Sequence, residues 1–112
     1  MSKLIGEQVL MRIFIGESDR HGRTPLYEAL LELLRKEGIA GATVLRGISG
    51  FGAHHVCHTQ KLLDLSANLP LVIEVIDSKE KLDAVMPLID GMMVGGMITL
   101  EKATVIRYSE KQ

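Results

Sequence analysis

The sequence has little cysteine, few aromatic residues and no long apolar run. Cys57 is the only cysteine, so the chain cannot form an intramolecular disulfide, which fits a reducing compartment. No apolar run approaches the roughly 18 residues of a membrane span. The N-terminal segment reaches the acidic Glu7 without an apolar core of the kind found in secretory signals. We therefore expect a cytoplasmic protein with no inserted membrane segment.

Neither sign of charge is in excess. Thirteen basic and 14 acidic residues give a formal net charge of −1, and the isoelectric point is near 6.4. Binding to nucleic acid calls for a basic surface, so we expect no nucleic-acid partner, although a local basic patch can still hold a small anion. The 112 residues, 46% hydrophobic and 24% charged, suffice for one globular domain over residues 1–112 and are too few for two.

Hydrophobic periodicity predicts two helices. Apolar residues at i, i+3, i+4, i+7 and i+8 from Leu26 to Leu34 mark the first, with Thr24 as N-cap, Pro25 as first helical residue and Gly38 as C-cap. The second follows a cap at residues 77–78 and buries residues 82, 85, 86 and 89. A proline at position 87 removes one backbone hydrogen bond and should kink or shorten its last turn.

Runs of β-branched, apolar and aromatic residues predict four strands. These are Val9–Ile15, Ala42–Ile48, Leu69–Ile76 and Met97–Tyr108. With the helices, the order is β-α-β-β-α-β, so we predict an α+β, ferredoxin-like fold with an antiparallel sheet and both helices on one face. The runs VLMRIFI and LVIEVI are nearly continuous, whereas a sheet with one wet face should alternate apolar and polar residues. We infer that other copies of the chain cover the second face.

A long loop separates the second and third predicted strands. Residues 49–68 number 20, whereas a median connection has about five. A loop of this length in a compact domain is usually functional or disordered, and Gly50-Phe51-Gly52 lies at its root. We expect this loop to respond to a ligand.

Several segments together resemble the short PII-like branch of the PII signalling superfamily. The clearest match is Gly41–Gly52 (GATVLRGISGFG), and Ile15–Asp19, Pro25–Leu30 and Leu69–Glu74 also match. The resemblance implies a homotrimer packed through its sheets, with an adenine nucleotide of the ATP, ADP or AMP type bound in clefts between subunits. It also implies that loop 49–68 changes conformation to signal to a regulated protein. The residues form no coherent catalytic constellation, so we expect that the chain is not an enzyme.

Six residues are candidates for the phosphate side of such a cleft: Arg46, Gly47, Gly50, Gly95, Gly96 and Arg107. Glycine before a strand can present backbone N–H groups to a phosphate at close range, although a glycine pair is often only a turn. Arginine offers phosphate a planar fork of donors, although a strand-end arginine can also be solvated or form an ion pair between subunits.

The sequence departs from the PII proteins at three places. Val105 stands where they carry a first arginine, residues 94–97 form a shorter turn without their phosphate-binding lysine, and the loop lacks the tyrosine modified in some of them. These departures point away from triphosphate and 2-oxoglutarate sensing and toward a weaker or different nucleotide.

Four loop residues offer metal donors within five positions: His54, His55, Cys57 and His58. Structural zinc usually draws on two separated pairs, and no second pair exists, so we expect no metal site. The alternative is a metal-responsive trimer similar to the divalent-cation-tolerance proteins.

No candidate catalytic group stands out. Cys57 beside His58 lacks an orienting carboxylate and an oxyanion device. The acids Glu17 and Asp19 are explained as well by capping or solvation as by catalysis.

Overall fold

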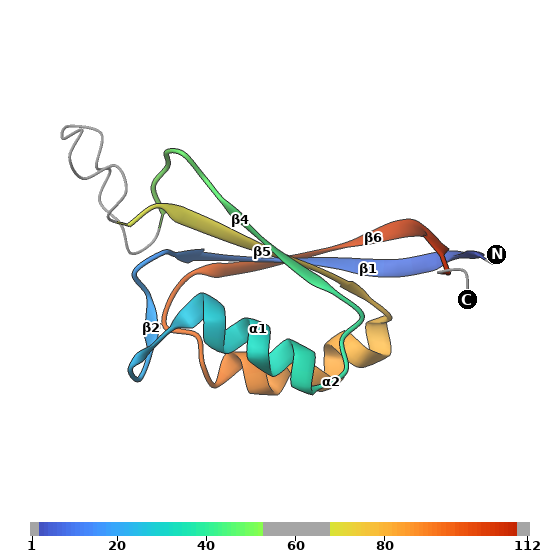
Figure 1. Cartoon of the computed structure of the whole chain (residues 1–112), viewed down its shortest axis with the longest axis horizontal. Helices are drawn as coiled ribbons and strands as arrows, with labels where there is room; N and C mark the ends of the chain where they lie inside the picture. The colour runs from blue at the N-terminus through green and yellow to red at the C-terminus, as the bar shows by residue number, and fades with distance from the viewer. Residues whose placement is uncertain (1–2, 53–67, 110–112) are drawn as a thin grey trace.

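A four-stranded antiparallel sheet carries both helices on one of its faces (Figure 1). The computed structural model describes residues 3–52 and 68–109. The elements are β1 (Lys3–Gly16), β2 (Arg20–His21), β3 (Thr24–Pro25), α1 (Leu26–Lys36), β4 (Ala42–Arg46), β5 (Pro70–Asp77), α2 (Lys79–Asp90) and β6 (Met97–Tyr108). The sheet order is β4-β5-β1-β6. This is the split βαβ arrangement, and the predicted ferredoxin-like fold is confirmed.

The core lies between the sheet and the two helices. Successive side chains in a strand point to opposite faces, so alternate residues of β1 and β5 meet the apolar stripes of α1 and α2. Each of these residues is at most 5% exposed: Met11, Ile13, Ile15, Leu26, Leu30, Leu34, Leu71, Ile73, Val75, Leu82, Val85 and Ile89. In the described part of the chain, no helix is both long and apolar enough to cross a membrane.

The start of α1 differs from the prediction. Thr24 and Pro25 do not begin the helix, because they form β3 and pair with β2 in a small hairpin. The helix starts at Leu26, whose backbone N–H donates to the carbonyl of Asp19 at 2.8 Å. Pro25 therefore occupies the N-cap position without a side-chain cap. The predicted cap was wrong because the hairpin takes these residues into a β pairing, a constraint that helix periodicity does not contain.

The other predicted helix ends agree with the structure. After α1, the N–H of Gly38 donates to Arg35 and that of Ile39 to Leu34, which is a Schellman motif. Ser78 is the N-cap of α2, and its hydroxyl accepts a hydrogen bond from the backbone of Lys81 at 3.2 Å. α2 extends past its internal proline to Asp90.

Strand boundaries differ from the prediction in β1 and β4. β1 pairs with β6 at 12 positions, from Lys3–Tyr108 to Phe14–Met97, and with β5 at only eight. The predicted strand missed its first six residues because the polar run Gly6-Glu7-Gln8 hides them. β1 and β6 extend together beyond the helices (Figure 1). β4 ends at Arg46 rather than at residue 48.

The sheet face opposite the helices is left uncovered by the described residues (Figure 1). By strand alternation it carries a set of apolar residues: Leu10, Phe14, Leu45, Val72, Ile76 and Met97. Of these, Leu45, Ile76 and Met97 are 47%, 39% and 54% exposed. We call this surface the open face. These residues are the reason that the hydrophobic runs of β1 and β5 are nearly continuous in the sequence.

A charged group lies in the middle of the open face. Arg12 of β1 donates to Glu74 of β5 at 3.0 Å and also to Glu101 of β6. The hydrogen bond to Glu74, and then that to Glu101, raises the pKa of the Arg12 guanidinium above its usual value. Arg12 therefore stays charged at any working pH and links the two strands that flank it.

Gly96 gives a test of the turn that precedes β6. It has φ +85°, and a Cβ atom there would lie 2.5 Å from the carbonyl oxygen of Phe14. We expect Gly96→Ala to lower the free energy of unfolding by about 1–3 kcal/mol, measured by urea denaturation at fixed chain concentration. Gly41→Ala is the control, because a Cβ atom there meets no heavy atom within 4 Å. Equal stability of the two variants would contradict this account.

Candidate functional site

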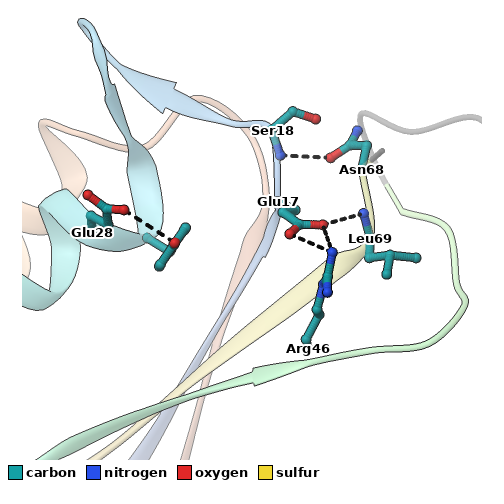
Figure 2. A network of polar contacts seen from close by, with 7 residues as sticks. Glu17, Ser18, Glu28, Arg46, Asn68 and Leu69 are labelled. Atoms are coloured by element: carbon teal, nitrogen blue, oxygen red, sulfur yellow. Dashed lines mark hydrogen bonds and ion pairs between the residues drawn. The ribbon is translucent and has the colours of Figure 1, made fainter. Parts of the chain in front are cut away.

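Glu17, directly after β1, is the centre of a polar network where the loop leaves and rejoins the sheet. One guanidinium nitrogen of Arg46, Nη2, lies 2.8 Å from Glu17 Oε2 and 3.0 Å from Oε1 (Figure 2). The backbone N–H of Leu69 donates to Oε1 at 3.4 Å. Arg46 is the last residue of β4, and Leu69 directly precedes β5. The Glu17 carboxylate therefore joins the two ends of the long loop.

Backbone hydrogen bonds fix the same region. The N–H of Glu17 donates to the carbonyl of Leu69 at 2.8 Å, and that of Gly47 to the carbonyl of Pro70 at 2.7 Å. The N–H of Ser18 donates to the side-chain oxygen of Asn68 at 3.0 Å (Figure 2). Gly47 is required here, because a Cβ atom on it would lie 2.9 Å from the ring of Pro70. The root of the loop is thus held at defined positions on both sides.

A hollow of about 460 Å³ lies beside this network, and we call it the root hollow. Its walls come from the end of β1, the segment after β4, the start of β5 and the turn before β6. Its lining includes Phe14, Ile15, Asp19, Gly50, Phe51, Gly52, Asn68, Pro70, Leu71, Gly96 and Met97. The lining is mainly apolar with two polar side chains, which is the usual make-up of a small-molecule site.

The root hollow brings together part of the predicted phosphate site. Gly50 and Gly96 line it, and Gly95 precedes Gly96 in the turn before β6. Gly47 is bonded to Pro70, a wall residue, and Arg46 lies in the adjoining Glu17 network. These five residues are therefore neighbours within one chain.

Arg107 lies elsewhere. It pairs with Leu4 near the start of β1, whereas the other end of β6, at Met97, pairs with Phe14 beside the root hollow. The ten residue steps from position 97 to position 107 span about 33 Å of strand. One chain therefore does not place Arg107 with the other candidates, and its proposed role requires a second chain.

Arg107 instead lines a second hollow, of about 650 Å³, at the far end of the open face. Gln8, Thr43, Ile76 and Val105 also line it. The side-chain oxygen of Gln8 is buried and has no hydrogen-bond partner among the described residues. A buried acceptor of this kind is costly unless a donor reaches it. Sequence reasoning did not find this hollow, because its residues come from several strands with no shared motif.

The proposed metal donors His54, His55, Cys57 and His58 lie outside the described residues, so the metal alternative stays untested. Over residues 3–52 and 68–109, no three His, Cys, Asp or Glu side chains are grouped so as to hold a metal ion.

Sequence reasoning missed the role of Glu17. Glu17 follows a buried strand in the sequence, and solvated or capping acids are common at that position, so nothing marks it as part of a network. Its partner Arg46 ends β4, and β5 separates β4 from β1 in the sheet. Only the strand order brings the two charges together, so no spacing in the sequence could have revealed the pair.

Comparison of the sequence with known proteins places this chain in a family. Residues 8–105 match the model of DUF190, described as uncharacterised ACR. A UPF0166 protein of Aquifex aeolicus is 40% identical over 97 residues, covering 87% of this chain and 91% of its own. A UPF0166 protein of Methanocaldococcus jannaschii is 36% identical over 78 residues, covering 70% and 71%.

Solved structures show the same fold at low identity. CPII of Thiomonas intermedia K12, a nitrogen regulatory PII-like protein solved with ADP and bicarbonate, has a TM-score of 0.59 at 18% identity, covering 91% of each chain. A putative PII-like signalling protein of Thermus thermophilus has a TM-score of 0.57 at 14% identity, covering 91% of this chain and 90% of its own. The chain therefore belongs to the DUF190 family and has the fold of the PII-like proteins.

Proposed function

We propose that this chain is a non-enzymatic PII-like regulatory protein that binds an adenine nucleotide, such as ADP or ATP, in clefts between the subunits of a homotrimer. The observation that carries the proposal is the root hollow, which gathers Gly50 and Gly96 beside Arg46. CPII, whose fold this chain shares, has been solved with ADP, AMP and bicarbonate, which supports an adenine nucleotide as the ligand class.

The lining of the root hollow suits the two halves of a nucleotide. Phe14 and the 78% exposed Phe51 offer apolar surface to a base. Gly95 and Gly96 have φ values of +83° and +85°, and successive glycines in a turn can present backbone N–H groups to a phosphate. Arg46 supplies a cation in the Glu17 network that adjoins the hollow. The ligand would therefore place its base inside and its phosphates toward Arg46.

The trimer is supported by two features of the single chain. The open face exposes apolar residues that a second copy would cover, and interfaces between copies are more apolar than the rest of a surface. Arg107 lies about 33 Å of strand away from the root hollow, so it can complete a nucleotide site only in another subunit. Residues 1–112 would then act as one domain whose binding site needs two copies.

In this proposal loop 49–68 is the responsive element. Both of its ends are tied to Glu17 and to the first residues of β5, so a ligand in the root hollow contacts the segment that carries the loop. A regulated protein would recognise the loop, and the single cysteine fits a cytoplasmic setting.

Nucleotide binding can be tested by isothermal titration calorimetry. We expect ATP, ADP or AMP to bind the full chain, and Arg46→Gln and Arg107→Gln each to weaken binding about five- to tenfold, because each removes a charge-assisted hydrogen bond. Arg35→Gln is the matched control, because Arg35 pairs with Glu32 on the exposed side of α1. Absence of binding by any adenine nucleotide at millimolar concentration would refute the proposal.

The assembly can be tested by light scattering after size exclusion. We expect wild type at micromolar concentration to have three times the 12.3 kDa chain mass. Ile76→Glu should lower that mass, because it puts an unpaired charge on the open face. Leu88→Glu is the control, since Leu88 lies on α2 and is 46% exposed, close to the 39% of Ile76. A wild-type monomer, or equal masses for the two variants, would contradict the proposed interface.

A further inference from the structure

We propose that the Glu17 carboxylate competes with the anionic group of the ligand for Arg46. A ligand phosphate or carboxylate then has to displace Glu17 from Nη2 of Arg46. This inference rests on the proposed function for its ligand, and it adds a regulatory contact to the same site.

Glu17 contacts Arg46 in the way that a bound oxyanion would. Both carboxylate oxygens contact Nη2 of Arg46, at 2.8 and 3.0 Å, and one of them also accepts from the backbone of Leu69 at 3.4 Å (Figure 2). A phosphate or carboxylate ligand would likewise present two oxygens to the guanidinium and the backbone N–H. Glu17 therefore occupies, from within the chain, one guanidinium nitrogen of Arg46 that an external anion would use.

Electrostatics makes the two anions compete for Nη2 of Arg46. With Glu17 in contact, the charge of Arg46 is already balanced, so a phosphate approaching the same nitrogen meets a carboxylate of its own sign. The Glu17 side chain is 27% exposed and that of Arg46 is 51% exposed. Ion pairs this open to solvent are weak, equivalent to a factor of about two to five in a binding constant, so a nucleotide can replace the carboxylate.

Displacement would reach the other end of the loop. The Glu17 side chain contacts Leu69 as well as Arg46, so its release from Arg46 also loosens the side-chain contact at the start of β5. The backbone bond from Glu17 to Leu69 would remain and preserve the strand pairing. Occupancy of Arg46 is thus coupled to the residue at which the chain re-enters the sheet.

Calorimetry with ADP on the full chain tests the competition. We expect Glu17→Gln to bind ADP about two to five times more tightly than wild type, because Arg46 is no longer occupied. Glu28→Gln removes the same charge from an acid that bonds Tyr27 and not Arg46, and should leave the affinity unchanged. In an Arg46→Gln background, Glu17→Gln should have no effect. Weaker binding by Glu17→Gln would show that Glu17 positions Arg46 instead, and would overturn the proposal.

Two further measurements separate the competition from overall charge and from the nucleotide. Glu17→Asp keeps the charge but shortens the side chain, and it should also tighten ADP binding. Inorganic phosphate, titrated while the Arg46 side-chain N–H signals are followed by NMR, should bind Glu17→Gln more tightly than wild type even if no nucleotide binds. If phosphate binds but no adenine nucleotide does, the proposed function is refuted and the competition is not. Equal phosphate affinities in the two proteins would refute the competition.

Discussion

One-sided packing of two helices on a four-stranded sheet is the constraint on which the rest of the structure depends. Met11, Ile13 and Ile73 are fully buried on the helix side. Because strands alternate, burying these residues sends Leu10, Phe14 and Val72 to the other face, where no described element covers them. The same pairing carries Arg12 onto that face between Glu74 and Glu101. The open face is therefore a direct result of how the core is built.

The strand order also determines the loop root. β4 and β1 flank β5 and run antiparallel to it. The ends of β4 and β1 and the start of β5 therefore meet at the same end of the sheet. That meeting point places Glu17 against Arg46 and Leu69, and it places the root hollow beside them. The other end of the sheet carries the second hollow with Gln8 and Arg107. Each chain thus presents two different concave surfaces about one strand length apart.

The sequence was sufficient for the element order and for most of the core, because helical and strand periodicity record which side chains face inward. The predicted helix start at Thr24 and Pro25 was wrong, because these residues pair in a local hairpin. Sequence reasoning also failed at Lys3–Gln8, which is a strand because β6 pairs with it and not because its residues are apolar. Gly50 and Gly96 were predicted as site residues from glycine chemistry and a family resemblance, and both line the root hollow. The contact between Glu17 and Arg46 was not found, since it depends on a third strand lying between their own.

The position of Arg107 has a thermodynamic consequence in the proposed assembly. A site completed by a second chain exists only in the oligomer, so ligand binding and subunit association are linked equilibria. Each bound nucleotide would stabilise the assembled form by mass action, and dilution of the protein would lower the apparent affinity. In that assembly, chain concentration would influence nucleotide binding alongside the concentration of the nucleotide itself.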